Sequence, residues 1–367
     1  MDGRDLAGGP AAGLRQPRGI ARYAASLLGA MAARHPDDEW TVLLPPGAGT
    51  PPVAGVTFRR QRVGGRAVRA SSALVGRPRL DRLIGRGVDV MWLPSPAPVA
   101  VSAGVPYVLT VHDLSPELRP SDRGAYERLW SRAARPRRLA RAAAAVMAVS
   151  EATRRDVVLR WGVPAERVAL VRSGVWRPPA VTAEESAAVR ARLGVAARYL
   201  LYVGALEPRK GLHGLLESYA RARGGGLDAQ LVLVGDGPLR TRLSGPGVRL
   251  IGRVDDAVLG ALYAGARATL LPSWLEGFGF TPLESLAAGT PTVVSDLAPL
   301  RETLGEAGVF VTPGDVDAWA SALLRIDRDE DLRRSLLAGA PGALEPLSWE
   351  RAADSSHAIL SRAAQRR

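Results

Sequence analysis

The chain has 367 residues and a mass of 38.8 kDa, which corresponds to about two domains. Its 47% of hydrophobic residues excludes a mostly disordered protein, and the absence of cysteine excludes thiol catalysis and cysteine-ligated metal sites. The longest apolar run, Ala142–Val149, has 8 residues, too few to span a membrane. The N-terminus lacks the apolar stretch of a signal peptide, so we expect a cytoplasmic protein.

The positive charge is concentrated in the first half of the chain. The net charge is +13; residues 1–180 hold 28 arginines against 14 acids, whereas residues 181–367 hold 21 basic and 22 acidic residues. Arginines cluster over Arg59–Arg86 and over Arg128–Arg141. Such clusters are solvated surface or attract anionic lipid, nucleic acid or phosphorylated substrates. One hypothesis is that this half docks on the anionic inner face of the plasma membrane.

The first half contains apolar runs typical of buried strands, with helical patterns between them. The glycine-rich stretch Gly8–Gly19 and the helix after it resemble the loop and helix that follow a first strand, so we expect the natural chain to begin upstream of Met1. In chain order the pattern predicts a helix at Ile20–Arg34, strands at Trp40–Leu44, Val88–Leu93 and Tyr107–Val111, a helix at Tyr126–Ala140, a strand at Ala145–Val149 and a helix at Glu151–Arg160.

The second half alternates strands and helices with glycine at strand ends, which favours a doubly wound parallel sheet of the α/β class. The predicted strands are Arg198–Gly204, Gln230–Gly235, Val248–Gly252, Ala268–Pro272 and Pro291–Ser295; the predicted helices are Lys210–Ala222, Val258–Ala264, Thr281–Ala288 and 348–363. The stretch Ser173–Ala183 is rich in proline and glycine and marks the boundary. We therefore predict domains at 1–175 and 176–347, followed by a C-terminal helix within 348–367.

The segment Pro272–Asp296 is the richest in functional residue types. Glu276 follows a predicted strand, and Glu284, eight residues later, lies in the first turn of the next predicted helix. Gly277 and Gly279 let the backbone approach a ligand closely. The helix N-terminus directs a partial positive charge to the same place. Such a site can bind a diphosphate through backbone N–H groups and sugar hydroxyls through its carboxylates.

Three further segments carry candidate residues. Gly204 to Gly211 (GALEPRKG) offers Arg209 and Lys210 to phosphate oxygens. His112 and the neighbouring aspartate end a predicted strand, where open α/β sheets bind ligands. Gly19, in RGIARY, lies at a helix entry.

Two other patterns favour structural interpretations. The D-x-D pairs Asp315–Asp317 and Asp327–Asp329 are interpreted as solvated charges near a helix start and on a charged helix at 327–334, rather than as metal ligands. Gly235-Asp236-Gly237 lacks the third glycine of a dinucleotide-binding loop, so a tight turn is the better interpretation.

Together these segments resemble the retaining glycosyltransferases of family 4, over nearly the whole chain. EGFGFTPLE matches the E-x7-E motif of that family, flanked by GALEPRKG and AAGTPTVVSD. The resemblance implies the GT-B fold: two Rossmann-like domains facing a cleft, with the C-terminal helix crossing back to the first domain. RGIARY and VHDL resemble a mannosyltransferase-type subgroup that elongates surface polysaccharides.

The resemblance also implies roles for individual residues. Glu276 would contact the donor sugar, Glu284 would hold the ribose, and His112 would face the transferred sugar. Arg209 and Lys210 would neutralise the diphosphate, so that neither a metal nor another cofactor is required. The remaining implied donor-binding residues are Gly19, Gly204, Gly277, Phe278, Gly279, Phe280 and Thr281. Thr281 replaces a more usual aliphatic residue and Ala21 a more usual glycine, which bears on donor specificity.

The implied activity is transfer of a sugar, mannose from GDP-mannose as the first expectation, from a nucleotide-sugar to a glycan or lipid-linked acceptor. A nucleotide-sugar epimerase of the same fold stays open as an alternative. A phosphorylase would need a pyridoxal lysine, and Lys210, the sole lysine, lies in the phosphate-binding segment. A nucleic-acid binder is disfavoured, because only 5% of residues are aromatic and Arg59–Arg86 contains none. We therefore expect no nucleic-acid partner.

Overall fold

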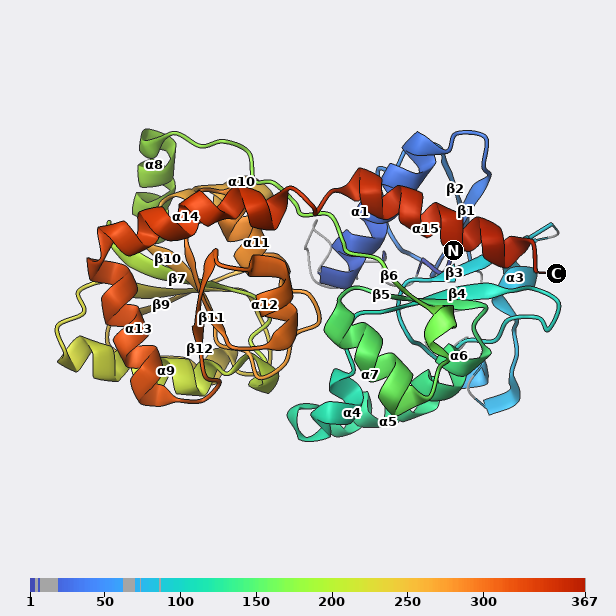
Figure 1. Ribbon diagram of the computed structural model, residues 1–367, viewed down its shortest axis with the longest axis horizontal. Helices are drawn as coiled ribbons and strands as arrows, with labels where there is room; N and C mark the ends of the chain where they lie inside the picture. Colours follow the sequence, from blue (N-terminus) through green and yellow to red (C-terminus); the bar gives the residue numbers. More distant parts are fainter. Residues whose placement is uncertain (4–5, 7–18, 62–69, 73, 86, 367) are drawn as a thin grey trace. The chain divides into compact units, whose positions relative to one another are not determined.

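The computed structural model describes residues 1–3, 6, 19–61, 70–72, 74–85 and 87–366 (Figure 1). The chain forms two compact units, one of Met1–Gly174 with Leu347–Arg367 and the other of Val175–Pro346. The boundaries placed from the sequence, after residues 175 and 347, lie one residue from these divisions. Most of the glycine-rich stretch Gly8–Gly19 lies outside the described residues.

The Val175–Pro346 unit contains a six-stranded, wholly parallel sheet in the order β12-β11-β10-β7-β8-β9. The five strands predicted in this half are confirmed; β12 was missed. The strands are β7 (Tyr199–Val203), β8 (Gln230–Val234), β9 (Val248–Gly252), β10 (Ala268–Leu271), β11 (Thr292–Ser295) and β12 (Gly308–Val311).

Helices cover both faces of this sheet. They are α8 (Ala183–Leu193), α9 (Leu212–Gly224), α10 (Asp256–Ala264), α11 (Phe280–Ala287), α12 (Ala298–Leu304), α13 (Val316–Arg328) and α14 (Glu330–Leu344), with short 3-10 turns at Pro208–Lys210 and Arg240–Arg242.

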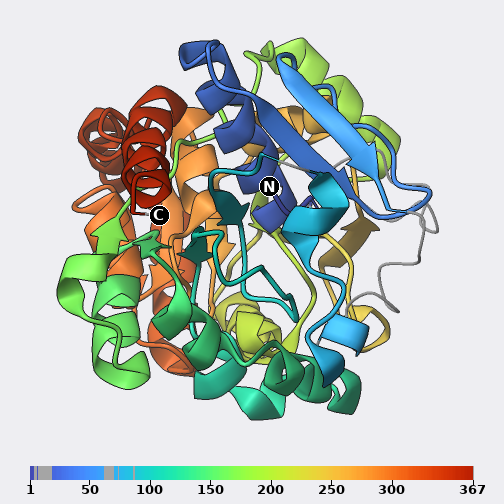
Figure 2. The ribbon, with the colours of Figure 1, turned by 90° about the vertical axis from the view of Figure 1, so that its right-hand side faces the viewer.

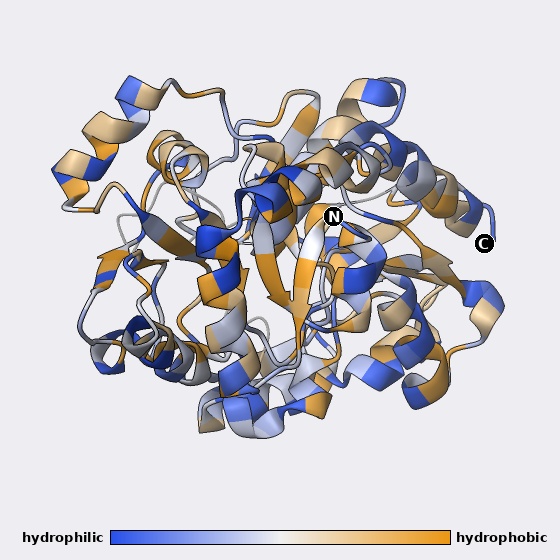
Figure 3. Ribbon diagram, turned by 60° about the vertical axis from the view of Figure 1, so that its left-hand side comes forward, coloured by the Kyte–Doolittle hydropathy of each residue, from blue (hydrophilic) through white to orange (hydrophobic). Residues whose placement is uncertain are grey.

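Alternation along β7 explains how both faces are buried. Leu200 and Tyr202 join an apolar cluster with residues of α9 and α13, while Tyr199 and Leu201 join one with residues of α10. Successive side chains of a strand point to opposite faces, so a continuously apolar strand needs cover on both sides. Figure 3 shows the strands mainly in hydrophobic colours and the helices with hydrophilic stripes.

The other unit contains two groups of parallel strands, β1-β2 and β3-β4-β5-β6. Figure 2 shows β1 and β2 side by side. Four of these strands were predicted, and the short β2 and β6 were missed. The strands are β1 (Trp40–Leu44), β2 (Val56–Arg60), β3 (Met91–Leu93), β4 (Tyr107–Val111), β5 (Ala145–Ala148) and β6 (Val168–Leu170).

Met1–Gly3 lies between β1 and β3. Asp2 forms a parallel bridge with Leu43, and its N–H donates to the carbonyl of Trp92 at 3.1 Å. A Cβ on Gly3 would lie 2.4 Å from Val42 Cγ1. These three residues therefore occupy the position of a central strand, which was expected to be missing. The expectation that the natural chain begins upstream stays a prediction.

The helices of this unit are α1 (Gly19–Arg34), α3 (Leu80–Ile84), α4 (Ser115–Leu118), α5 (Ala125–Ala134), α6 (Pro136–Ala142), α7 (Glu151–Trp161) and α15 (Trp349–Ala364). The C-terminal helix α15 packs on α1, β4 and β5. Arg34 on α1 donates two hydrogen bonds to Asp354 on α15, at 2.5 and 2.7 Å. Among the described residues, none of the helices combines the length and apolarity needed to cross a bilayer.

The single helix predicted at Tyr126–Ala140 is wrong, because the chain breaks between α5 and α6. Arg135 has a left-handed backbone with φ 45°, and Pro136 begins α6. A residue that precedes proline is disfavoured in the right-handed helical region, so the break follows from the sequence.

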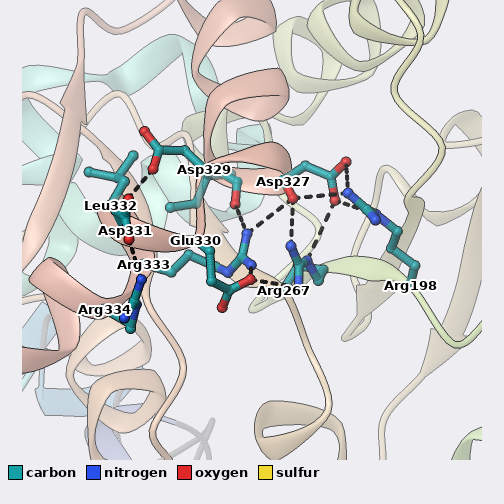
Figure 4. A network of polar contacts seen from close by, with 10 residues as sticks. Arg198, Arg267, Asp327, Asp329, Glu330, Asp331, Leu332, Arg333 and Arg334 are labelled. Carbon is teal, nitrogen blue, oxygen red and sulfur yellow. Dashed lines mark hydrogen bonds and ion pairs between the residues drawn. The ribbon is translucent and has the colours of Figure 1, made fainter.

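The predicted charged helix at 327–334 is also wrong. Asp327 lies in the last turn of α13, and Asp329 caps α14 by accepting a hydrogen bond from the N–H of Leu332 at 2.8 Å. Asp327 is 1% exposed rather than solvated. Arg198 and Arg267, which directly precede β7 and β10, converge on it (Figure 4).

Candidate functional site

The candidate site of the Val175–Pro346 unit lies at the carboxyl ends of β7 and β10, which are neighbours in the sheet. The segment after β7 runs to Gly211, and the segment after β10 runs to Gly279, the N-cap of α11. Loops at this edge of a parallel sheet are where such folds bind ligands. Gly204, Arg209, Lys210 and the E-x7-E segment all belong to this edge, as the sequence predicts.

Close backbone approach holds the two segments together. Gly211 has φ 67°, and a Cβ on it would lie 2.0 Å from the carbonyl oxygen of Pro272. The N–H of Trp274 donates to the carbonyl of Arg209 at 2.9 Å. Glycine is required at position 211 by both its conformation and its lack of a side chain. The helix predicted to begin at Lys210 begins instead at Leu212, because Lys210 ends a 3-10 turn and Gly211 separates that turn from α9.

Lys210 and Glu276 form a buried ion pair across the two segments. Lys210 Nζ lies 2.5 Å from Glu276 Oε1, and each side chain is 11% exposed. Ser273 Oγ donates to the same carboxylate oxygen at 2.6 Å. Lys210 is therefore held in a fixed position beside a carboxylate, which distinguishes it from a mobile surface cation.

The charges of this pair respond to burial and to each other. Burial acts to raise the pKa of Glu276, but the nearby cations Lys210 and Arg209 and the hydrogen bonds to the carboxylate outweigh it, so that its pKa is lowered. Burial lowers the pKa of the Lys210 ammonium. Arg209, whose Nε lies 3.2 Å from Glu207 Oε2, is the second cation that acts on Glu276. The site therefore holds an ionised carboxylate near two cations.

The residues from Gly277 to Thr281 form a tightly packed entry to α11. Gly277, Phe278 and Gly279 are buried, and Gly279 has φ 90° at the helix N-cap. The carbonyl of Phe278 accepts a hydrogen bond from Thr303 Oγ1 at 3.1 Å, and the Phe278 and Phe280 rings lie 4.9 Å apart. Thr281 Oγ1 donates to the carbonyl of Val203, the last residue of β7, at 3.3 Å. This entry is thus fixed to the β7 end of the site.

Glu284 lies deeper in the same helix than predicted. Because α11 begins at Phe280, Glu284 falls just past the first turn, where it is 8% exposed. Its Oε2 accepts a hydrogen bond from the hydroxyl of Tyr263, on α10, at 3.1 Å. Burial of the E-x7-E carboxylates with polar partners favours a binding role over a simple charge at a helix start.

His112 and Gly19 belong to the other unit. His112 directly follows β4; its Nε2 lies 2.9 Å from the carbonyl oxygen of Pro94, and its ring packs edge-on against Tyr23 of α1, with centroids 4.6 Å apart. Gly19 is the exposed first residue of α1, and no atom of the described residues beyond its chain neighbours lies within 4 Å of a Cβ placed there. The histidine is therefore held in a defined orientation, whereas no described residue sterically requires glycine at position 19.

The patterns interpreted as structural have structural partners. Asp315 caps α13 through the N–H of Ala318 at 2.9 Å, and Asp317 pairs with Arg221. A Cβ on Gly235 would lie 1.8 Å from the carbonyl oxygen of Gly204, so the turn after β8 serves to approach the loop after β7. Within the described ranges, no group of three or more histidine, aspartate and glutamate side chains is placed to hold a metal ion.

Two partners in the site were missed from the sequence. Ser273 stands three residues before Glu276 in the same loop, a spacing that could have indicated the hydrogen bond. Tyr263 lies 21 residues before Glu284, on a different helix, so no local pattern signals the hydrogen bond.

Comparison with known proteins gives a family for both halves of the chain. Residues 17–175 match the profile described as Glycosyltransferase Family 4, and residues 197–329 match that described as Glycosyl transferases group 1.

Three similar relatives are named mannosyltransferases. The O-antigen chain mannosyltransferase B of Escherichia coli is 31% identical over 66% of this chain and 67% of its own length. The phosphatidyl-myo-inositol mannosyltransferase of Mycobacterium leprae is 36% identical over 43% and 44%, respectively. The MMP alpha-(1->4)-mannosyltransferase of Mycolicibacterium hassiacum is 31% identical over 63% and 57%. The chain thus spans between about half and two thirds of these relatives' lengths.

Solved structures of low sequence identity share the fold. WaaG, a glycosyltransferase involved in lipopolysaccharide biosynthesis, matches with a TM-score of 0.70 at 18% identity, covering 93% of this chain and 96% of WaaG. Sucrose-phosphate synthase from Thermosynechococcus elongatus matches with a TM-score of 0.67 at 21% identity, covering 94% of each chain. HepE of Anabaena, solved with UDP and glucose, matches with a TM-score of 0.68 at 19% identity, covering 94% of this chain and 97% of HepE. The chain is therefore a glycosyltransferase that belongs to family 4 and has the GT-B fold.

Proposed function

We propose that the chain transfers a sugar, with retention of anomeric configuration, from a nucleotide-sugar to a glycan or lipid-linked acceptor in surface polysaccharide or glycoconjugate synthesis. Mannose from GDP-mannose is the first candidate donor, because three relatives are named mannosyltransferases. The observation that carries the proposal is the buried Lys210–Glu276 pair at the carboxyl edge of β7 and β10.

The pair offers complementary contacts to a sugar diphosphate. The Lys210 ammonium and the Arg209 guanidinium suit diphosphate oxygens, and the Glu276 carboxylate suits sugar hydroxyls. Glu284, which Tyr263 holds in place, would accept hydrogen bonds from the ribose. The N–H groups around Gly277 and Gly279 lie at the start of α11, where the helix dipole favours negative charge.

In the proposed reaction, the bond between the anomeric carbon and the diphosphate oxygen breaks, and a bond from that carbon to the acceptor oxygen forms on the same face. The acceptor proton passes to the departing diphosphate oxygen. Arg209 and Lys210 would stabilise the charge that develops on this leaving group without a metal. His112, oriented by the carbonyl of Pro94, would face the transferred sugar, and Gly19 would lie near the phosphates.

The donor test is a calorimetric and thermal-shift screen with GDP, UDP, dTDP and ADP, each free and as sugar conjugates. We expect one nucleotide to bind the unaltered chain and to lose affinity in Glu284→Gln, which preserves side-chain volume. Glu217→Gln, at an exposed glutamate of α9, is the matched control and should bind like the parent. A folded protein that binds none of the nucleotides would overturn the proposal.

The transfer test uses the donor identified by that screen. With a glycan acceptor, we expect a product whose anomeric configuration, read by NMR coupling constants, matches that of the donor. An inverted product would contradict the retaining mechanism, and conversion of the donor without acceptor would favour the epimerase alternative.

A further inference from the structure

Helix α5 carries an apolar stripe that it does not bury. Tyr126, Leu129, Trp130 and Ala133 recur at the spacing of one helix face, a pattern that helices normally pack against a core. Of the ten residues of α5, Ala134 alone is buried. Tyr126 is 62% exposed and Leu129 is 68% exposed. By contrast, α1 in the same unit buries seven of its 16 residues.

Aromatic and aliphatic side chains are combined on this helix. The Tyr126 and Trp130 rings lie nearly parallel, at 11°, with centroids 6.0 Å apart, so that one ring supports the other. Tyrosine and tryptophan are favoured where an apolar phase meets water, because each has an apolar body and a polar atom. Leu129 beside them offers only apolar surface, which would contribute nothing to binding the phosphate backbone of a nucleic acid.

Uncompensated cations surround these side chains. Arg128 and Arg132 on α5, Arg135 at the break and Arg138 on α6 are exposed, and none of the four forms an ion pair with an acid in the described part of the chain. Neighbouring arginines differ, since Arg119 pairs with Asp122 and Arg137 with Glu117. We call the six exposed residues Tyr126, Arg128, Leu129, Arg132, Arg135 and Arg138 the α5 face; Figure 1 labels the helices α5 and α6 that carry them.

We propose that the α5 face docks on an anionic lipid bilayer, with Tyr126 and Leu129 entering the interface and the arginines contacting lipid phosphates. Apolar residues bordered by arginines on one exposed helix are the arrangement that binds such surfaces in parallel orientation. The inference rests on the proposed function for its purpose, the presentation of a lipid-linked acceptor, and adds which surface makes the contact.

The test is co-sedimentation of the full chain with vesicles of phosphatidylcholine alone and of phosphatidylcholine mixed with phosphatidylglycerol, without donor or acceptor. We expect binding to the mixed vesicles only, weakened by salt. Arg128→Gln with Arg132→Gln should reduce the binding constant about 25-fold, at about fivefold for each arginine. Tyr126→Ser with Leu129→Ser should reduce it about tenfold or more.

Two matched controls separate the α5 face from net charge and general apolarity. Arg192→Gln with Arg242→Gln removes the same charge from exposed positions of the Val175–Pro346 unit. Leu159→Ser removes a leucine that is 79% exposed on α7. Both should bind vesicles like the parent. Circular dichroism and melting temperature identify any variant that is misfolded.

Equal binding to neutral and mixed vesicles, or unchanged binding of both α5 variants, would overturn the proposal. Preferential binding of a nucleic acid over vesicles, lost in the same variants, would overturn it in favour of another partner. Nucleotide affinity, measured on the same variants, reports the donor site separately. A chain that binds vesicles but no nucleotide would sustain the docking surface while the proposed function fails.

Discussion

Two buried carboxylates lie at opposite edges of the sheet of Val175–Pro346, and each pairs with residues that flank β7 and β10. Asp327 accepts hydrogen bonds from Nε and Nη2 of Arg198, which precedes β7, each at 2.8 Å. Arg267, which precedes β10, also pairs with Asp327. Glu276, which follows β10, pairs with Lys210, which follows β7. Asp327 thus forms ion pairs with two arginines, whereas Glu276 forms its direct ion pair with Lys210.

The two edges of the sheet are held together by different kinds of contact. The amino edge is joined by side-chain charges that pair with one another: Arg333, 5% exposed, also donates to the carbonyl of Asp327 at 3.0 Å (Figure 4). The carboxyl edge is joined by backbone approach at Gly211 and leaves a compact pair of opposite charges in one loop cluster. The first arrangement is structural, and the second is suited to exchange contacts with a substrate.

The largest effect is expected from Asp327→Asn. Arg198 and Arg267 would lose their anion but cannot shed their protons. We expect the free energy of unfolding to fall by about 3 kcal/mol, the lower end for a broken buried pair because Arg198 is partly exposed. Hydrogen exchange of peptides from β7 and β10 measures this locally, and a change below about 1 kcal/mol would contradict the structural assignment.

Gly211→Ala should have the next largest effect, because it disrupts the close backbone contact with Pro272 at the carboxyl edge of the sheet. The new Cβ would meet the Pro272 carbonyl at a left-handed residue, so we expect a loss of about 2–3 kcal/mol and loss of nucleotide binding. Gly214→Ala is the matched control: it lies within α9 with open space around a Cβ, and it should stabilise the protein by up to about 1 kcal/mol. Equal behaviour of the two variants in urea unfolding would refute the contact.

Glu276→Gln should lower the free energy of unfolding by about 1–2 kcal/mol at pH 7. The loss is moderate because the amide oxygen can still accept hydrogen bonds from Ser273 and Lys210. Burial lowers the pKa of Lys210, so in this variant the destabilising charge is present below that folded pKa and is relieved as pH rises toward the unfolded value of about 10.4. The difference from the parent should therefore narrow between pH 7 and about 10. Arginine does not titrate in this pH range, so the loss of unfolding free energy in Asp327→Asn should stay constant. If the losses in Glu276→Gln and Asp327→Asn showed the same dependence on pH, the contrast between the two ion pairs would be contradicted.

The smallest effect is expected from Tyr263→Phe, which removes the hydroxyl that holds Glu284. We expect about 1 kcal/mol of lost stability and a few-fold weaker nucleotide binding by calorimetry. Tyr199→Phe removes a similar buried hydrogen bond, from the first residue of β7 to the carbonyl of Leu262 at 2.6 Å, without altering a contact of Glu284. It should match the stability loss without the affinity loss; an equal affinity loss in both would mean that Tyr263 acts only through packing.

The sequence predicts most of this unit's sheet because its strands are continuously apolar, and their ends are marked by glycine and proline. It also predicts the candidate site, since Glu276, Glu284, Arg209 and Lys210 all fall in two short segments. It does not predict that Lys210 and Glu276 pair, because 66 residues separate them and only the neighbouring positions of β7 and β10 bring them together.

The remaining errors have physical causes of two kinds. Asp327 reads as a solvated charge because its partner Arg198 lies 129 residues away, and local pattern carries no information on such contacts. The helix break at Arg135 could have been predicted from the sequence, because the following Pro136 disfavours a helical conformation at residue 135. Short strands such as β6, with three residues, offer too few positions for any periodicity to emerge.

Lys210 has a practical consequence that follows from its being the only lysine of 367 residues. The chain offers amine-directed reagents one ε-amino group, and that group sits in the candidate site with 11% of its side chain exposed. Acylation should therefore be slow, should add a single side-chain mass increment, and should slow further when a donor covers the amine. Intact-mass spectrometry would turn this residue into a built-in occupancy reporter that needs no engineered label.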